Sequence, residues 1–179
     1  MSEQTASRLV TFRVGADLYA ADIFSVERVL RYQPPRAIPG VPDWVEGVLE
    51  YGGCIVPVID FRRRFSAPVT APAAQTRLLV LSREGEWMAA IVDQVLDVRP
   101  VGPDDIAPPP PLVSGLAGDY LRGVVRREGG LVVVLDVDRI LGATDALSLR
   151  EVLEAGTAAA GTLGAAGAMT NGPMQGEGE

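Results

Sequence analysis

Two aspartates at matching positions are the first residues in the chain that could perform chemistry. Asp60 and Asp136 each follow a short apolar run, and two carboxylates brought together can act as general acid and general base. The same residues suit the start of a turn, where an aspartate side chain accepts hydrogen bonds from backbone amides. Because both aspartates recur within a longer repeat, we predict the capping role and keep a carboxylate-based hydrolase as the alternative.

Three other features have reactive side chains. Asp104 and Asp105 could bind a divalent cation, but after Pro103 they fit a helix start or a loop better. The basic run 62–64 could bind an acidic partner or a phosphate, and otherwise forms a solvated turn. Cys54 is the single cysteine, and no histidine exists to activate it as a nucleophile.

The amino-acid composition removes much of the usual catalytic repertoire. The 179 residues include no histidine, and every basic residue is arginine. The chain therefore lacks an imidazole base, the commonest zinc ligand and a phosphohistidine. It also lacks a Schiff-base lysine and the lysine of a phosphate-binding loop. We predict no catalytic residues, no metal site and no cofactor.

Charge and hydropathy narrow the range of partners. The net charge is -7, which disfavours nucleic acid as a partner because phosphate backbones are also negative. A small-molecule or oligonucleotide-binding barrel remains an alternative, although 6% aromatic residues offer few stacking platforms. No run of about 18 apolar residues exists, so no direct membrane insertion is expected. A lone cysteine favours the cytoplasm.

An internal repeat predicts the architecture. Two hairpin patterns, 9–23 and 78–92, are each followed by a Gly-Val pair, a glycine five residues later, a run of β-forming residues and an aspartate. The first copy ends with the run 55–59 and Asp60, and the second with the run 131–135 and Asp136. Because one copy is too small to bury a good core, we predict a mainly β fold of two small barrels packed together.

The same pattern predicts the domain boundaries. Residues 1–7 form a flexible N-terminus, and the barrel halves cover roughly 8–66 and 77–147, with some strand exchange possible. A Pro/Ala-rich link separates the halves. A capping box opens a short terminal helix over 148–154. The Gly/Ala-rich segment 155–179 has few large apolar residues and is predicted to be a disordered tail.

Several short motifs, in this order and spacing, resemble one family. They are Leu9–Phe12, Tyr19–Ile23, Gly53–Arg62, Val92–Val98, Tyr120–Gly123 and Leu135–Leu141. Together they cover about residues 8–150 and resemble the CheW-like chemotaxis coupling (adaptor) proteins. The resemblance implies two five-stranded SH3-like barrels. It also implies a non-catalytic, cytoplasmic scaffold at membrane receptor arrays, which links methyl-accepting chemotaxis receptors to a CheA-type histidine kinase.

The resemblance also implies where the partners bind. In that family a groove between the barrels receives the receptor signalling tip, and the matching positions are Ile23, Val26, Val29, Val95 and Val98. The regulatory domain of the kinase is expected around Ile38, Val41, Gly47 and Leu49.

Two positions depart from the pattern of the family. Gly52 stands where the family commonly has the arginine of Asn-Leu-Arg-Gly, and Arg28 stands where an acidic residue is frequent. Both changes alter the charge presented to a partner and are expected to alter partner choice. The sequence therefore indicates a coupling protein of a divergent chemosensory system. A non-flagellar output, such as surface motility, pili or a second messenger, is the alternative.

Overall fold

The computed structural model describes residues 7–109 and 120–142, and these contain eleven strands. The predicted helix 148–154 and tail 155–179 lie outside the described residues, as does most of the N-terminus 1–7. The strands are β1 (Ser7–Val14), β2 (Asp17–Asp22), β3 (Val26–Arg31), β4 (Val45–Tyr51), β5 (Cys54–Asp60), β6 (Arg77–Arg83), β7 (Glu86–Val92), β8 (Gln94–Val101), β9 (Ile106–Ala107), β10 (Leu121–Arg127) and β11 (Gly130–Leu135). The short helices are η1 (Ile23–Ser25), α1 (Phe61–Arg64), η2 (Pro103–Asp105) and α2 (Val137–Gly142).

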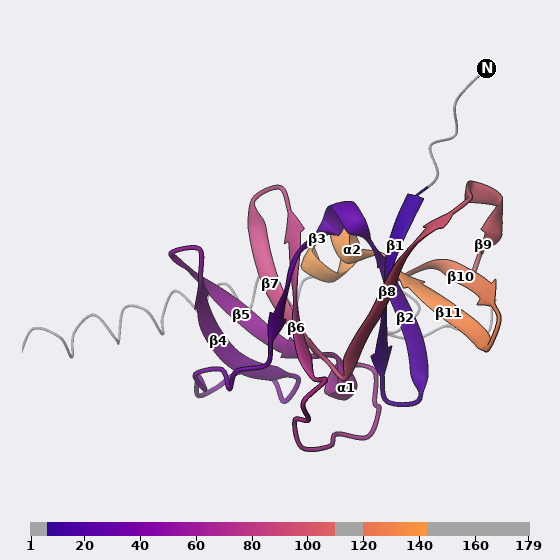
Figure 1. Cartoon of the computed structure of the whole chain (residues 1–179). Helices are drawn as coiled ribbons and strands as arrows, with labels where there is room; N and C mark the ends of the chain where they lie inside the picture. The colour runs from indigo at the N-terminus through magenta and orange to yellow at the C-terminus, as the bar shows by residue number, and fades with distance from the viewer. Residues whose placement is uncertain (1–6, 110–119, 143–179) are drawn as a thin grey trace, which may run out of the picture.

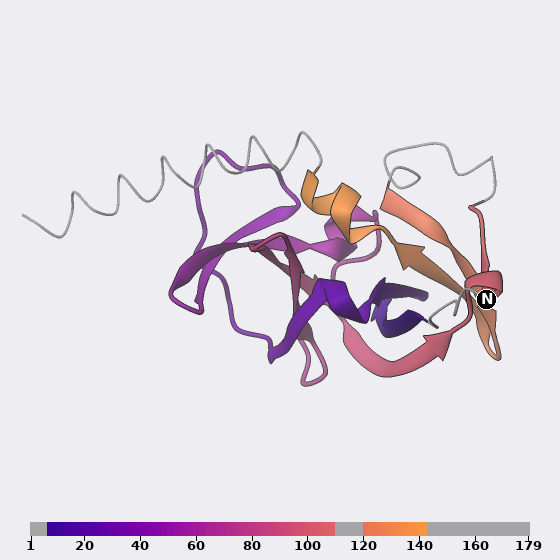
Figure 2. The ribbon, with the colours of Figure 1, turned by 90° about the horizontal axis from the view of Figure 1, so that it is seen from above.

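The strands form two small barrels that lie side by side (Figures 1 and 2). Barrel I has the strand order β8-β1-β2-β11-β10-β9, and barrel II has the order β3-β6-β7-β5-β4. The chain after β3 closes barrel II through a bridge between Arg36 and Val48, and β9 closes barrel I by pairing with β10. The predicted mainly β fold of two barrels is confirmed. The two-residue β9 gives barrel I a sixth strand.

The barrels do not follow the sequence halves 8–66 and 77–147. Barrel I takes the hairpin β1–β2 from the first half, and barrel II takes the hairpin β6–β7 from the second. Two parallel pairings make this exchange: β11 lies beside β2, and β5 lies beside β7. The repeat is kept, because the matching pairs Val134–Ala20 and Val58–Ala89 are in register.

The continuous apolar runs follow from this arrangement. In β6, Leu78 and Val80 point into barrel II, whereas Leu79 and Leu81 belong to a core between the barrels. In β1, Leu9 belongs to the core of barrel I, and Val10 faces the core between the barrels. Both faces of these strands are buried, so the alternation of polar and apolar residues disappears. We call the shared cluster the inter-barrel core. Its members are Val10, Phe12, Val14, Ala21, Ile59, Phe61, Leu79, Leu81, Met88, Ala90, Val92, Leu135 and Val137.

Candidate partner-binding surface

Two edge strands border the inter-barrel core. Among the described residues, β3 pairs only with β6, and β8 pairs only with β1, so each has one edge without a described strand beside it. Val29 lies opposite Leu79, and Val98 lies opposite Val10, which is the matching position of the repeat. Since cross-strand partners point to the same face of a sheet, both valines face the side of the inter-barrel core.

The five residues predicted for the receptor groove lie on these strands and on η1. Val29 and Val98 are 40% and 49% exposed. Ile23, Val26 and Val95 are half-buried and pack against the inter-barrel core. The structure therefore gives each barrel one exposed valine, supported by half-buried aliphatic residues that anchor the strand.

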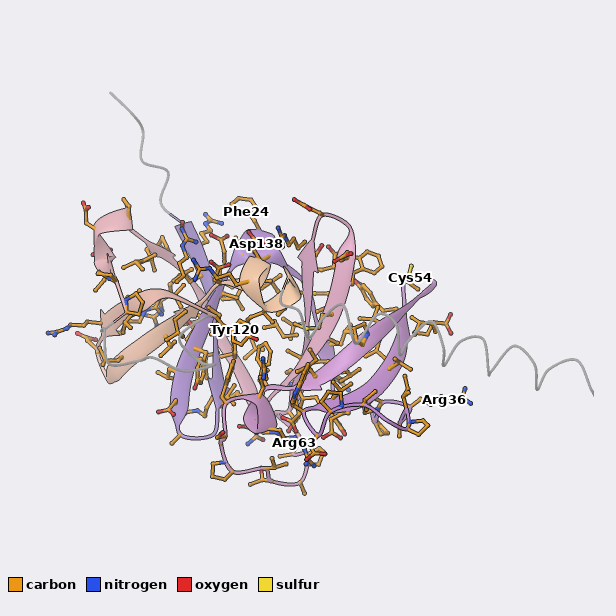
Figure 3. All side chains as sticks on the ribbon, turned by 180° about the vertical axis from the view of Figure 1, so that it is seen from behind. Phe24, Arg36, Cys54, Arg63, Tyr120 and Asp138 are labelled. Atoms are coloured by element: carbon orange, nitrogen blue, oxygen red, sulfur yellow. The ribbon has the colours of Figure 1, made fainter. Side chains whose placement is uncertain are left out.

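Two exposed apolar side chains near this surface were missed by the sequence analysis. Phe24, in η1, is 90% exposed and projects from the molecule (Figure 3), and Leu96, in β8, is 40% exposed. Leu96 occupies a bulge, because the register of β8 on β1 shifts between Asp97 and Val95. A bulge re-aims one side chain, and the sequence holds no local signal for it.

The four residues predicted to bind the kinase differ in accessibility. Ile38 and Val41 are half-buried in the segment before β4. Leu49 is 7% exposed and belongs to the core of barrel II. Gly47 is buried, and a Cβ there would lie 2.1 Å from the carbonyl oxygen of Arg36. Gly47 permits the close approach that closes the barrel, so it and Leu49 shape this surface from beneath.

The basic run 62–64 is neither a solvated turn nor a free anion site. Arg62 is 3% exposed, and its guanidinium donates to both carboxylate oxygens of Asp60, at 2.9 and 2.8 Å. The hydrogen bond with Asp60 raises the pKa of Arg62, against the opposing effect of burial. Asp60 also accepts from the backbone amide of Arg62 at the start of α1, which confirms its predicted capping role.

The buried arginine also links segments that are distant in the sequence. Its Nη1 donates to the carbonyl oxygen of Thr70 at 2.9 Å and lies 3.5 Å from Oδ1 of Asp93. The other oxygen of Asp93 accepts from the amide of Gly15 at 2.7 Å. The network thus ties α1 to the link between the halves, to the β7–β8 junction and to the β1–β2 turn.

The other two arginines of the run also have partners. Nε of Arg63 lies 2.8 Å from Glu46 in β4. The guanidinium of Arg64 lies 4.7 Å from the ring centroid of Trp44 and 5.0 Å from that of Tyr120. Its Nη2 also hydrogen-bonds the Tyr120 hydroxyl. Because Trp44 precedes β4 and Tyr120 precedes β10, Arg64 joins the two barrels.

Two other candidate carboxylates, Asp136 and Asp105, are held locally. Asp136 accepts from the amide of Arg139 and pairs with its guanidinium at 3.4 Å, which confirms a cap at α2. Asp105 accepts from the amide of Gly102 at η2. Asp60 and Asp136 each bond an arginine of their own turn, so the structure offers no support for a shared dyad. Within 7–109 and 120–142, no group of three or more potential ligands is placed to hold a metal ion.

Comparisons with known proteins show the family of this chain. The family model for the CheW-like domain matches residues 8–145. The chain belongs to the CheW-like domain family. A relative from Treponema pallidum named "Chemotaxis protein CheW" is 30% identical over 142 residues, covering 77% of this chain and 84% of the relative. Protein FrzA of Myxococcus xanthus is 34% identical, covering 66% of this chain and 73% of the relative.

A solved structure agrees with the fold of this CheW-like protein. The scaffolding protein TtCheW from Thermoanaerobacter tengcongensis superposes with a TM-score of 0.71 at 26% identity, covering 78% of this chain and 95% of the other. In the part of the CheW-like chain that the structure describes, no helix has the length and apolar character needed to cross a membrane.

Proposed function

We propose that this protein is a chemosensory coupling protein, a non-catalytic scaffold that links a methyl-accepting chemoreceptor to a CheA-type histidine kinase. It would act in the cytoplasm, recruited to membrane receptor arrays. The observation that supports this most is the pair of exposed valines, Val29 and Val98, on the edge strands beside the inter-barrel core. Family membership and the likeness to a scaffolding protein support it as well.

The receptor site of the proposal is the apolar surface made by Ile23, Val26, Val29, Val95 and Val98. A helical hairpin offers a stripe of apolar side chains that can be buried against such a surface. The two valines come from different barrels, so a bound hairpin would sense how the barrels sit relative to each other. Coupling needs binding that differs between receptor states, and a two-barrel site is suited to this.

The kinase site of the proposal is the segment before β4, where Ile38 and Val41 are half-buried. Arg36 lies at the same end of barrel II and points outward (Figure 3). The buried Gly47 and Leu49 hold the backbone beneath this segment. The kinase regulatory domain would then contact one barrel while the receptor contacts both, so the two partners can bind together.

A non-flagellar output is a second candidate. Arg28 and Gly52 depart from the family pattern at positions on and near the proposed sites. Two relatives that are not named as chemotaxis proteins support it further. These are FrzA, described above, and Protein PilI of Pseudomonas aeruginosa, which is 26% identical over 66% of this chain and 67% of its own length.

The test is a binding and kinase assay on Val98→Glu with Val69→Glu as its matched control. Val98 and Val69 are 49% and 46% exposed, but Val69 lies in the link between the halves. Val98→Glu should weaken binding of a purified receptor tip at least about tenfold, or about 1.4 kcal/mol, and lower receptor-dependent kinase activity. Val69→Glu should change neither.

Thermal melting completes the test, because both variants alter exposed sites and should melt as the wild type does. Val26→Glu is a weaker probe of the receptor site, since Val26 packs on the inter-barrel core and its change would also cost stability. Equal receptor affinity for Val98→Glu and Val69→Glu would refute the assigned receptor surface.

A further inference from the structure

The negative charge of the chain is unevenly placed. Residues 7–109 and 120–142 hold sixteen Asp and Glu residues and fifteen arginines, a net charge of -1, whereas the whole chain carries -7. The described part of the chain is thus nearly neutral, and a local excess of arginine on it is not offset by a general acidic field.

One such excess lies on β3 and the segment that follows it. Arg28, Arg31 and Arg36 are exposed, and we call them the β3 arginine strip. Within the described residues none of the three has a carboxylate partner, although Arg63, Arg83, Arg99, Arg122, Arg127 and Arg139 each have one. Glu27 is the one acidic residue between Val26 and Val41.

The pairing of β3 with β6 adds a further positive charge. Arg31 lies directly opposite Arg77. Like charges in this arrangement destabilise a sheet. Arg77 turns its Nη1 to the carbonyl oxygens of Ala74 and Thr76, at 2.7 and 2.9 Å, which leaves Arg31 without a described partner. Arg31 is thus an exposed cation that a group from outside the described chain can neutralise.

The position of the strip indicates which group that is. Arg31 shares one face of β3 with Val29, the exposed valine of the proposed receptor surface, because their cross-strand partners Arg77 and Leu79 lie two residues apart. Arg28, opposite Val80, lies on the other face, beside the outer edge of the strand. A partner segment that buries Val29 therefore meets Arg31 on the same face and Arg28 at the strand edge. Guanidinium pairs best with carboxylates, often through two parallel hydrogen bonds.

We propose that the β3 arginine strip selects a receptor hairpin whose helix carries Asp or Glu beside its apolar stripe. The carboxylates pair with Arg31 beside Val29 and, across the edge of β3, with Arg28, while the stripe covers Val29. This inference rests on the proposed function, and it specifies the chemistry of the partner at the same site. On β8, the other edge strand of the proposed receptor surface, Arg99 is paired with Asp97, which also lies near Arg127 of β10. β8 therefore offers the same partner apolar contact and no unpaired cation.

The test uses Arg28→Glu/Arg31→Glu, with Arg13→Glu/Arg126→Glu as the matched control. Arg13 and Arg126 are exposed on barrel I, with no ion pair to a described residue, and the control has the same change in total charge. The probe is the purified signalling-tip hairpin of a chemoreceptor from the same genome. The β3 double reversal should weaken binding at least about tenfold and reduce the dependence of affinity on salt. The control should do neither.

A charge-swapped probe makes the test specific. When the acidic residues next to the apolar stripe of the tip are changed to lysine, the β3 double reversal should bind it more tightly than the wild type does. Unchanged affinity of the double reversal for the native tip, or no recovery with the swapped tip, would overturn the inference. If binding is lost with Val98→Glu but not with the double reversal, the proposed function stands and the acidic partner does not. If the wild-type protein binds no receptor tip, the proposed function itself is refuted, and the further inference is refuted with it.

Discussion

Replacing Arg62 by methionine should be among the most damaging single changes outside the apolar cores. The guanidinium is 3% exposed, donates to Asp60 and to the carbonyl oxygen of Thr70, and lies 3.5 Å from Asp93. Methionine fills similar volume without any donor. The carboxylate of Asp60, itself 1% exposed, would then be buried with Nε of Arg63, at 4.0 Å, as its nearest described counter-charge.

The magnitude follows from that poorly neutralised carboxylate. Removing one partner of a buried ion pair costs about 3–5 kcal/mol, because the remaining charge is neither hydrated nor neutralised. For a domain of this size each kcal/mol lowers Tm by about 2–4 °C, so the expected fall is roughly 6–20 °C. Since domains are stable by only about 5–15 kcal/mol, Arg62→Met should lie close to the threshold of folding.

The assay is chemical denaturation of a double-mutant cycle with Asp60→Asn. Asparagine retains a side-chain oxygen for the amide of Arg62, so the cap on α1 survives while the charge is removed. The double variant leaves neither member of the pair charged. It should therefore be more stable than the two single losses predict, by about 1–3 kcal/mol.

The pH dependence provides an independent check. The hydrogen bond with Asp60 raises the pKa of Arg62, so its folded pKa lies above its unfolded one. Stability from such a group is fully present below the unfolded pKa and is lost only as the pH rises through the folded value. The difference between wild type and Arg62→Met should thus stay constant from pH 7 to pH 9. A loss under about 1 kcal/mol, or strict additivity in the cycle, would refute the buried-pair reasoning.

Two further predictions concern the glycines that lie against the backbone at the closure of each barrel and the arginine that joins the two barrels. Gly47→Ala and Gly123→Ala should each cost several kcal/mol in denaturation assays. A Cβ at these positions would lie 2.1 Å from the carbonyl oxygen of Arg36 and 2.6 Å from that of Ala107, in the segments that close the barrels. The control is Gly129→Ala, which has a positive φ but open space around it and should cost only about 1–2 kcal/mol. A small loss at Gly47 would show that the closing segment moves freely. Arg64→Ala should cost about 1–2 kcal/mol, since the guanidinium stacks on one aromatic ring from each barrel, and Arg64→Lys should recover less than half of the loss. A lysine variant as stable as wild type would contradict the stacking argument.

Local patterns account for the parts of the fold that were predicted correctly. The hairpins β1–β2 and β6–β7 were visible as alternating β-forming residues around short turns, and the structure confirms both. The capping roles of Asp60 and Asp136 were also visible, because a cap depends on residues only two or three positions away. The repeat predicted that the two halves form equivalent strands in the same register.

The candidate site was predictable in part. The repeat and the family resemblance together led to Val29 and Val98, which the structure places at matching positions on exposed edge strands. The accessibility of Gly47 and Leu49 was not predictable, because a buried residue in a strand has the same sequence pattern whether a barrel wall or a partner covers it. The exposure of Phe24 depends on η1, where the chain turns from one barrel to the other.

The sequence by itself determined where the two first hairpins and the two continuous apolar strands lie, and that the two halves are equivalent, because these depend on residue type and short spacing. The edge strands β3 and β8, which carry the candidate surface, were not predicted as strands. Only the tertiary structure decided that the halves exchange their first hairpins. It also decided that, in the run of three arginines, Arg62 is buried, Arg63 pairs with Glu46 and Arg64 stacks on two aromatic rings. Strand pairing joins residues far apart in the chain, and a repeat of equivalent hairpins does not specify which copy becomes the neighbour. The burial of Arg62 follows from that choice, since its partners Asp93 and Thr70 come near it only after both barrels have closed.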